Sequence, residues 1–560
     1  MANMSGSRAL IESLMREKVK HIFGIPGGGV LPLCDELYDS ELHCILARHE
    51  QCAAHMADGY ARASGFPGVC IATSGPGATN LVTGIATAYM DSSPIIAVTG
   101  QVIRALIGKD AFQEADIVGI TTPITKWNTQ LRSPEEIPKT IKAAFHIAST
   151  GRPGPVLIDF PKDVQVEEAE IDFSTSLNLR GYKPNYNPHP IQIKRAAELL
   201  VNAKYPMMLL GGGAIQSGAA QAVKLAELLS MPVANTLMGK GTIPEDHPLS
   251  VGMLGMHGTL EANTLILESD VIIVVGARFS DRTTGKLDEF CPDATIIHID
   301  IDAAEIGKNV KVSLPIVADA KITLESIYEQ IVNFGSNQDK SIWLDRIKEI
   351  RSQYTDNDHN PEANCLKPSE ILSELRNLLP KKSIVATEVG QNQMWAALNF
   401  KVFNPRTFIS SGGLGTMGFG FPAAIGAKVA KPDFPVVDIA GDGSFIMSEQ
   451  DLATCVSEQI PVIVIVLNNS MLGMVAQWQR LFYNRRYSWS KLGNLPDFVK
   501  LAEAYGAQGF RVETIRDFSR VLKKALKSDL TTVIDVPISP EEDVFPMVPA
   551  GAGLKDIMLS

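Results

Sequence analysis

The sequence lacks three features that would point to particular classes of protein. It has no clustered basic stretch, and 51 Lys and Arg against 62 Asp and Glu give a net charge of −11, which argues against nucleic acid as a partner. Its longest purely apolar runs, such as 461–467, fall far short of the roughly 20 residues that cross a membrane. Its seven cysteines show no CxxC pair and residues 1–12 no secretory signal, so we expect reduced thiols in a cytoplasmic protein.

What the chain does have is length and apolar content. Its 560 residues, 45% of them hydrophobic, exceed what one core holds. Short runs that are apolar on both faces alternate with helical segments, as in parallel strands between helices. These runs are 68–73, 95–98, 155–159, 207–210, 271–275, 296–300, 436–440, 462–467 and 532–536. Polar stretches at 164–190 and 335–367 predict linkers. We therefore expect an α/β protein with three doubly wound parallel-sheet domains, 1–163, 190–335 and 367–545, and a tail, 546–560.

Two strand ends in the third domain carry oxygen atoms suited to a metal ion. The strand VVDIA ends in Gly441-Asp442-Gly443-Ser444, and the strand PVIVIVL ends in Asn468-Asn469. Ligands bind at the carboxyl ends of parallel strands, and Mg²⁺ prefers carboxylate, amide and carbonyl oxygens. Either motif alone would be an ordinary turn. At this spacing the two together predict a magnesium and diphosphate site.

This pattern resembles the signature of the thiamine diphosphate enzymes, GDG followed further along by NN. The resemblance implies Asp442, Asn469 and the backbone of Met471 as metal ligands. It also implies that Glu50, supplied across a dimer interface, is the catalytic carboxylate that activates the coenzyme through its aminopyrimidine ring. The coenzyme contacts that it implies are Val389, Gly390, Gln391, Asn392, Gly415, Met417, Gly443, Ser444, Gly473, Met474 and Val475.

A competing motif lies at 413–418, where Gly413-x-Gly415-x-x-Gly418 matches the dinucleotide-binding fingerprint. Taken alone, this motif favours a nicotinamide-dependent dehydrogenase. The acidic residue that should follow it is Asp438, which lies within the strand that leads to the GDG motif. We therefore interpret the glycine-rich segment as a wall of the thiamine pocket, with Met417 supporting the coenzyme.

Within that class the whole chain is similar to the acetolactate synthase (acetohydroxyacid synthase) family. The matching blocks are 23–28, 74–80, 110–114, 123–126, 412–418, 473–479 and 547–554. The resemblance implies that Trp478 shapes the pocket for the second keto acid and favours 2-ketobutyrate. It further implies that Gly28, Phe112, Gln113 and Lys126 belong to the active site, reaching it from the partner subunit.

The middle domain carries a second part of this resemblance, to the members that retain FAD. Residues 276–282, GARFSDR, are close to the family pattern GARFDDR, although Ser280 replaces the first Asp. Another departure is Asn392, which stands where the family has His near the diphosphate. The FAD contacts that the resemblance implies are Gly211, Gly212, Gly213, Thr236, Leu237, Met238, Leu254, Gly255, Met256, His257, Gly276, Ala277, Arg278, Asp281, Arg282, Asp300, Ile301, Asp319 and Ala320.

The function implied is that of a carboligase in branched-chain amino-acid biosynthesis. Pyruvate would be decarboxylated on thiamine diphosphate, and the hydroxyethyl unit joined to a second pyruvate or to 2-ketobutyrate, giving 2-acetolactate or 2-aceto-2-hydroxybutyrate. The implied cofactors are thiamine diphosphate, Mg²⁺ and FAD. The implied partners are a second copy, in a homodimer or tetramer with active sites at the dimer interface, and a regulatory small subunit. A segment at 537–554 would close over the site.

Three alternatives stay open at this point. One is a pyruvate oxidase, and another is a catabolic acetolactate synthase without FAD. Trp478 and the block 278–282 argue against both. The third is a non-catalytic nucleotide-binding subunit, against which the presence of Glu50 argues.

Overall fold

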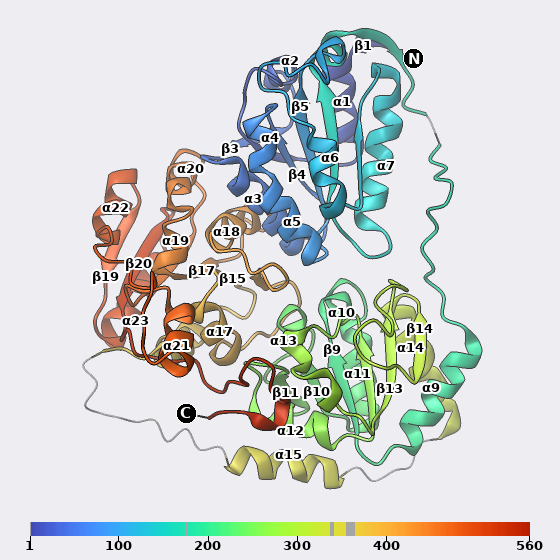
Figure 1. The fold of residues 1–560 in the computed structure, drawn as a ribbon, viewed down its shortest axis with the longest axis vertical. Helices are drawn as coiled ribbons and strands as arrows, with labels where there is room; N and C mark the ends of the chain where they lie inside the picture. The colour runs from blue at the N-terminus through green and yellow to red at the C-terminus, as the bar shows by residue number, and fades with distance from the viewer. Residues whose placement is uncertain (1, 175, 336–340, 354–364, 560) are drawn as a thin grey trace.

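The computed structural model describes residues 2–174, 176–335, 341–353 and 365–559, and three six-stranded parallel sheets follow one another along this chain (Figure 1). Helices cover both faces of each sheet. The predicted fold class, three doubly wound α/β domains, is confirmed. The boundaries predicted for these domains stay predictions.

The N-terminal sheet has the strand order β3-β2-β4-β5-β7-β6. Its strands are β2 (His21–Gly24), β3 (His43–Leu46), β4 (Gly68–Ala72), β5 (Ile95–Gln101), β6 (Trp127–Gln130) and β7 (Val156–Pro161). The main helices around it are α1 (Gly6–Arg16), α2 (Leu31–Tyr38), α3 (Glu50–Ser64), α5 (Val82–Met90) and α7 (Ile137–Ser149). A small antiparallel pair, β1 (Ala2–Ser5) with β8 (Glu168–Ile171), places a strand inside the first predicted linker.

The middle sheet has the order β11-β10-β9-β12-β13-β14. Its strands are β9 (Pro206–Leu210), β10 (Val233–Asn235), β11 (Ser250–Met253), β12 (Val271–Val275), β13 (Thr295–Asp300) and β14 (Leu314–Val317). Its main helices are α9 (Pro190–Asn202), α11 (Ala219–Leu229), α12 (Leu260–Glu268) and α14 (Ala320–Phe334). The second predicted linker contains a further helix, α15 (Ser341–Gln353). The buried indole of Trp343 donates a hydrogen bond to the carbonyl of Pro206 at 2.9 Å, which fixes this helix to the middle domain.

The C-terminal sheet has the order β16-β15-β17-β18-β20-β19. Its strands are β15 (Ile384–Thr387), β16 (Phe408–Ser410), β17 (Val436–Gly441), β18 (Ile463–Asn468), β19 (Gln508–Arg511) and β20 (Thr532–Pro537). Its helices include α16 (Pro368–Leu378), α17 (Gln391–Asn399), α18 (Gly420–Ala430), α19 (Asp442–Phe445), α21 (Gly473–Phe482), α22 (Phe498–Tyr505) and α23 (Ile515–Ala525). Each of the nine predicted apolar runs, over all three sheets, contains a strand.

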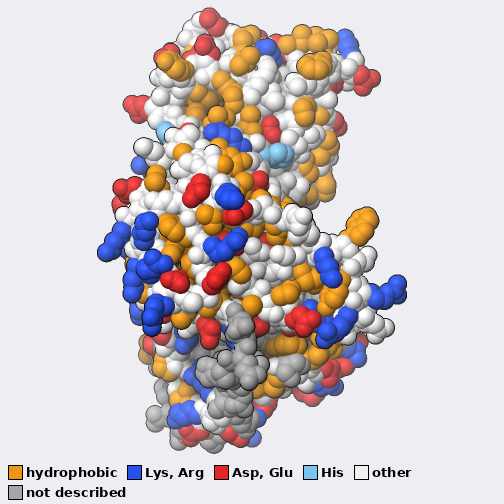
Figure 2. Space-filling model, turned by 90° about the vertical axis from the view of Figure 1, so that its left-hand side faces the viewer, with side chains coloured by type: hydrophobic (Ala, Val, Ile, Leu, Met, Phe, Trp, Pro, Cys, Tyr) orange, Lys and Arg blue, Asp and Glu red, His pale blue; other side chains and the backbone are white. Residues whose placement is uncertain are grey.

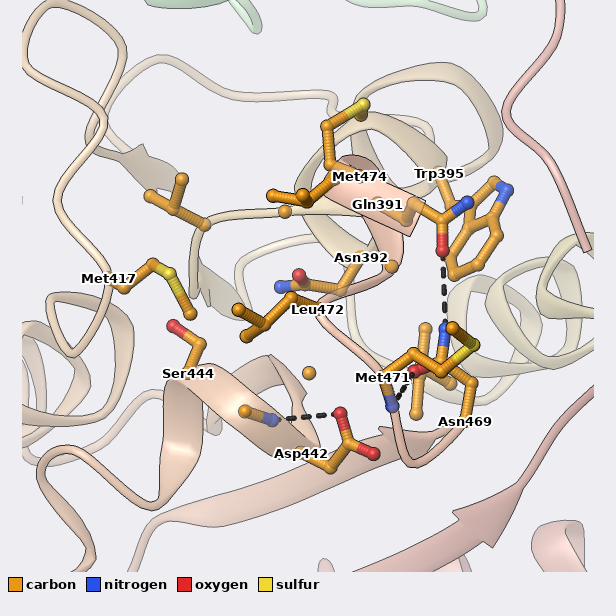
Figure 3. A pocket seen from close by; sticks show the side chains of 17 residues that line it. Gln391, Asn392, Trp395, Met417, Asp442, Ser444, Asn469, Met471, Leu472 and Met474 are labelled. Carbon is orange, nitrogen blue, oxygen red and sulfur yellow. Dashed lines mark hydrogen bonds between the residues drawn. The ribbon is translucent and has the colours of Figure 1, made fainter. Parts of the chain in front are cut away.

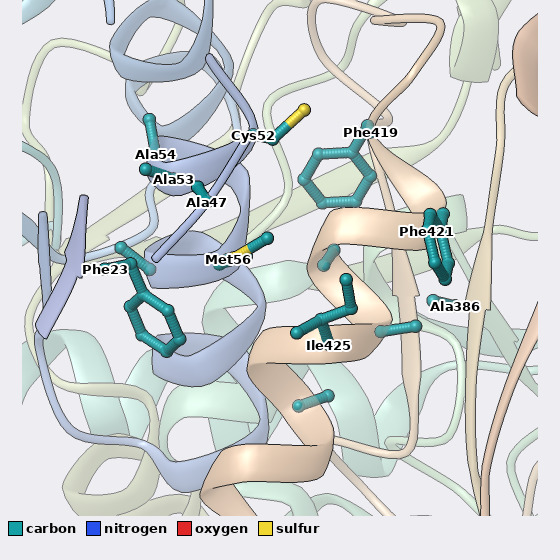
Figure 4. Packing of buried hydrophobic residues seen from close by; sticks show 14 of the residues in the cluster. Phe23, Ala47, Cys52, Ala53, Ala54, Met56, Ala386, Phe419, Phe421 and Ile425 are labelled. Carbon is teal, nitrogen blue, oxygen red and sulfur yellow. The ribbon is translucent and has the colours of Figure 1, made fainter. Parts of the chain in front are cut away.

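The N-terminal and C-terminal domains of the chain meet through α3 and α18, which lie side by side (Figure 4). Small residues allow this approach. A Cβ atom on Gly59 would lie 2.0 Å from the carbonyl oxygen of Ala423, and one on Gly426 would lie 1.8 Å from that of Met56. Both positions therefore require glycine. The contact joins residues of the two sheets in one buried hydrophobic cluster.

On the face shown in Figure 2, acidic, basic and hydrophobic side chains are interspersed. No helix of the described residues combines the length and the apolar character that a membrane span needs. The seven cysteines all lie in the described part of the chain, and each is free.

Candidate active site

Four strand ends of the C-terminal sheet surround a cavity (Figure 3). It lies at the carboxyl ends of β15, β16, β17 and β18, where β15 has β16 on one side and β17 on the other. Open α/β sheets bind ligands at such a switch in strand order. Of the predicted coenzyme and metal contacts, the cavity is lined by Val389, Gly390, Gln391, Asn392, Met417, Asp442, Gly443, Ser444, Asn469, Met471, Gly473, Met474 and Val475. Gly415 is not among its lining residues.

Asp442 and Asn469 bring oxygen atoms to neighbouring strand ends, directly after β17 and β18. Burial raises the pKa of the Asp442 carboxyl to about 6, although the backbone N–H of Gly443 donates to it at 2.8 Å. A carboxyl that is costly to ionise alone gains from a neighbouring cation. With the amide oxygen of Asn469 and the carbonyl of Met471, the donor set suits Mg²⁺. The residues present therefore fit the predicted metal ion.

Two of the helices that start at the cavity, α17 and α21, direct uncapped N-termini towards it. The first residue of α17 is Gln391 and that of α21 is Gly473, and neither N-terminus is capped by a side chain. The free N–H groups and the helix dipoles together make such ends binding sites for phosphate groups. The cavity therefore fits a diphosphate beside a divalent cation.

A chain of side-chain amides holds these elements together. The Asn469 Nδ2 group donates to Oε1 of Gln391 at 3.2 Å, and the Gln391 Nε2 group donates to Oε1 of Gln477 at 2.9 Å. A Cβ atom on Gly473 would lie 2.0 Å from the same Gln391 oxygen, so a larger residue there would displace the Gln391 side chain and disturb this chain of amides. Sequence reasoning did not single out Gln477.

Two of the polar residues predicted to contact the coenzyme donate side-chain hydrogen bonds to other groups of the protein. Asn392 donates its Nδ2 group to the carbonyl of Ile439 at 2.9 Å, and Ser444 donates its hydroxyl to Glu388 at 2.6 Å. The Ser444 hydroxyl therefore has no proton left to donate to a diphosphate, whereas the Asn392 amide keeps a second N–H. The cavity also includes Gly441 of the predicted diphosphate motif and three residues that were not predicted, Trp395, Leu467 and Leu472. Trp395 follows Gln391 by one helical turn, a spacing that would have revealed it.

A second set of predicted residues lies at the carboxyl edge of the N-terminal sheet. Glu50 begins α3 and is 9% exposed, and its Oε2 atom accepts a hydrogen bond from Asn80 at 2.9 Å. Gly28 lies in the turn after β2. Gln113 lies in the loop after β5, where a Cβ atom on Gly75 would be 2.8 Å from its carbonyl oxygen. Next to it, the side chain of Phe112 is 88% exposed.

Lys126 lies at the opposite edge of this sheet, since it directly precedes β6. Its ammonium group donates to the carbonyl of Thr150 at 2.8 Å and to the hydroxyl of Tyr182 at 3.1 Å. A third bond goes to the carbonyl of Ile147, near the end of α7. Burial lowers the pKa of Lys126 to about 8. Within one chain, therefore, the Lys126 ammonium group binds the carbonyls at the C-terminal end of α7, and Lys126 does not lie beside Glu50.

Glu50 and the cavity at Asp442 belong to different sheets of this chain. Among the described residues that line the cavity, none comes from the N-terminal domain. Trp478 is half-buried on α21 beyond the lining residue Val475, with its ring 5.6 Å from that of Phe482. One chain thus carries two separate groups of predicted catalytic residues.

The predicted FAD contacts all lie at the carboxyl ends of the six middle strands. Two of the glycines have an internal role, because a Cβ atom on Gly211 would lie 2.1 Å from the carbonyl oxygen of Gly276, and the N–H of Gly213 donates to that oxygen at 3.1 Å. These glycines let two strand-end loops touch, a role that is separate from the FAD contact that the resemblance implies for them.

Arg278 and Asp300 are the polar side chains that best fit a ligand at this edge. Arg278 is half-buried, and within the described ranges its guanidinium has no hydrogen bond or ion pair; burial lowers its pKa. Burial raises the pKa of Asp300 to about 6. A guanidinium without a partner suits a phosphate, and a strand-end carboxylate suits a ribose hydroxyl. The edge therefore fits a dinucleotide such as FAD.

Comparison with known proteins agrees with this geometry. Residues 4–120 match the N-terminal TPP binding domain of thiamine pyrophosphate enzymes, residues 193–327 match their central domain, and residues 388–536 match their C-terminal TPP binding domain. The fold and the C-terminal cavity thus define a thiamine diphosphate-dependent enzyme.

Full-length relatives narrow the class. The chain is 53% identical to a "Probable acetolactate synthase large subunit" of Methanocaldococcus jannaschii, over 99% of this chain and 95% of the relative. It is 47% identical to an "Acetolactate synthase" of Mycobacterium leprae, over 99% and 90%. It is 44% identical to an "Acetolactate synthase large subunit" of Haemophilus influenzae, over 100% and 99%. The chain belongs to the acetolactate synthase large-subunit family.

Proposed function

We propose that this enzyme joins two 2-keto acids with loss of carbon dioxide. Pyruvate is the donor, and a second pyruvate or 2-ketobutyrate is the acceptor, so the product is 2-acetolactate or 2-aceto-2-hydroxybutyrate. The observation that carries the proposal is the cavity in which Asp442, Asn469 and the N-termini of α17 and α21 meet. Full-length similarity to acetolactate synthases supports the choice of substrates.

The cavity residues would hold thiamine diphosphate through a magnesium ion. Asp442, Asn469 and the carbonyl of Met471 offer oxygen ligands to the ion, and the helix N-termini bind the diphosphate. Met417 lines the cavity and would support the coenzyme by apolar contact. When bound, thiamine diphosphate supplies the electron sink that loss of carbon dioxide from a 2-keto acid requires.

Glu50 would complete the site of a partner subunit. Its carboxyl is 9% exposed and lies at the carboxyl edge of its sheet, away from the cavity of its own chain. There it would hold a proton against the coenzyme's aminopyrimidine ring. Gly28, Phe112 and Gln113 lie at the same edge and would approach the substrate with it. The 88% exposed Phe112 supports this arrangement, because a subunit interface buries such a side chain.

Three further components belong to the proposal. FAD would bind at the carboxyl edge of the middle sheet through Arg278 and Asp300 without turning over in the reaction. A regulatory small subunit would associate with the large subunit. Residues 537–554 would shield the site, and the described segment already packs on α21, since Gln477 donates to the carbonyl of Val544 at 3.1 Å.

The test is a product assay. The enzyme is incubated with pyruvate, with and without 2-ketobutyrate, in the presence of thiamine diphosphate, Mg²⁺ and FAD under anaerobic conditions, and the acetohydroxy acids are quantified. We expect both products, with unchanged flavin absorbance. Flavin reduction coupled to pyruvate consumption would instead indicate an oxidase, and activity that does not respond to FAD would indicate the catabolic type of synthase.

A further inference from the structure

Below the thiamine diphosphate cavity, two acidic side chains are completely buried side by side. Glu388 follows β15 and Asp438 lies within β17, and both are 0% exposed. The two strands pair in parallel, with Thr387 opposite Ile439, so the two acids occupy neighbouring places in the sheet. Neither side chain is needed by the function proposed above, and neither lines the cavity.

Hydrogen-bond donors converge on only one of the two acids. The Oε1 atom of Glu388 accepts from the N–H of Phe421 at 2.9 Å, and its Oε2 atom accepts from the N–H of Gly418 at 2.8 Å and from the hydroxyl of Ser444 at 2.6 Å. Within the described part of the chain, neither carboxyl oxygen of Asp438 has a hydrogen-bond partner.

This contrast decides which acid is charged. Three donors and the N-terminus of α18 stabilise the carboxylate of Glu388. A buried carboxylate without donors would be very costly, so Asp438 carries a proton. Burial raises the pKa of both carboxyls, but at Glu388 the hydrogen-bond donors oppose this rise, whereas at Asp438 the neighbouring Glu388 adds to it and the pKa lies well above its usual range.

The bonds of Glu388 join two walls of the cavity. One wall contains Met417, which lines the cavity and is followed by Gly418. The other wall contains Gly443 and Ser444, which both line the cavity. The N–H of Gly418 also lies 3.2 Å from the Ser444 hydroxyl oxygen, which closes a ring of hydrogen bonds. Since Ser444 gives its proton to Glu388, its hydroxyl is not a donor towards the cavity.

We propose that Glu388 is a positioning residue, whose carboxylate fastens the turn at Gly418 to the turn at Ser444 and so fixes the shape of the coenzyme site. Asp438 is the protonated partner beside it. This inference rests on the proposed function, because it assumes that the cavity holds thiamine diphosphate. A positioning role affects how tightly the coenzyme binds more than the rate once it is bound.

The test compares two matched substitutions, Glu388→Gln and Asp438→Asn, in the full-length enzyme with Mg²⁺. Glu388→Gln removes the negative charge that accepts the hydrogen bonds from Gly418, Phe421 and Ser444. Asp438→Asn replaces a protonated, neutral carboxyl group by a neutral amide of the same shape. We expect Glu388→Gln to raise the Kd for thiamine diphosphate about tenfold or more, with kcat at saturating coenzyme changed less than the Kd. Asp438→Asn should leave the Kd within about threefold of wild type. The melting temperature of each coenzyme-free variant shows whether folding is affected.

Equal effects of the two substitutions, or a larger effect of Asp438→Asn, would overturn the assignment. If Glu388→Gln does not fold, Ser444→Ala carries the test, because it removes one of the bonds between the two walls. It should raise the Kd several-fold, and an unchanged Kd would refute the inference. A wild-type protein that binds no thiamine diphosphate would refute the proposed function itself, which is a distinguishable result.

Discussion

Arg62 and Asp91 form an ion pair with a distance of 2.9 Å between Nη2 and Oδ2, in which the Asp91 side chain is fully buried. Asp91 also accepts hydrogen bonds from the N–H groups of Gly412 and Gly413, at 3.1 and 2.6 Å. The pair comes from the N-terminal domain, whereas the two glycines begin the segment that leads to Met417. The N-terminal domain therefore holds one wall of the cavity of its own chain.

Replacing Arg62 by Met should destabilise the protein strongly. The substitution leaves Asp91 and the equally buried Asp58 without their counter-charge, which typically costs about 3–5 kcal/mol in free energy of unfolding. Urea unfolding measures this cost. The control is Arg8→Met, which breaks the partly exposed pair with Glu12 and should cost less than about 1 kcal/mol. Similar costs for both variants would contradict the role of the buried pair.

His55 should make stability depend on pH. It is fully buried on α3 against the ring of Phe419, and burial lowers its pKa to about 4. In the unfolded chain this residue binds a proton near pH 6.5, so its contribution is complete above that pH and is lost as the pH falls to about 4. The loss amounts to roughly 3 kcal/mol, at about 1.4 kcal/mol per pKa unit. Unfolding experiments on wild type and His55→Gln between pH 4 and 7.5 test this, and equal pH dependence in both would refute it.

Asp442→Asn should abolish metal-dependent coenzyme binding. The amide lacks the charge that offsets Mg²⁺, and we expect the affinity for thiamine diphosphate with Mg²⁺ to fall by about 100-fold or more in calorimetric titration. The control is Asp246→Asn, whose carboxylate pairs with Lys381 on the exposed surface. It should bind like wild type. Normal coenzyme affinity in Asp442→Asn would remove Asp442 from the metal site.

Trp478→Ala should change the choice of acceptor. If the ring contacts the extra methyl group of 2-ketobutyrate, its loss lowers the ratio of 2-aceto-2-hydroxybutyrate to 2-acetolactate by about tenfold in a competition assay. Phe482→Ala is the matched control, one helical turn further along α21 and in contact with the same ring. It should change the ratio less. A ratio unaffected by Trp478→Ala would show that another residue sets the preference.

The parts of the site that could be predicted from sequence are those set by local pattern. Asp442 and Asn469 follow apolar strands, and the carboxyl ends of parallel strands share one edge, so their proximity follows from the fold class. The same argument places the predicted FAD contacts at one edge of the middle sheet. The resemblance to thiamine diphosphate enzymes supplied the choice of cofactor, which residue spacing alone does not give.

What could not be predicted depends on packing between distant segments. The burial of His55 and Arg62 arises where α3 meets α18, and the roles of Glu388 and Ser444 arise where two turns meet over one carboxylate. Lys126 shows the same limit. Its sequence context gives no sign that its ammonium group donates hydrogen bonds to the carbonyls at the end of α7.

The central claim is that Glu50 of one subunit acts in the cavity of another, and mixing two inactive variants tests it most directly. Glu50→Gln and Asp442→Asn proteins are each assayed alone, then dissociated together, reassociated and assayed again for acetohydroxy acid formation. If the site is shared, each hybrid dimer contains one intact site, so random pairing should restore about one quarter of wild-type activity. If Glu50 acted within its own chain, every site in the mixture would lack one residue, and verified hybrid dimers without activity would contradict the account.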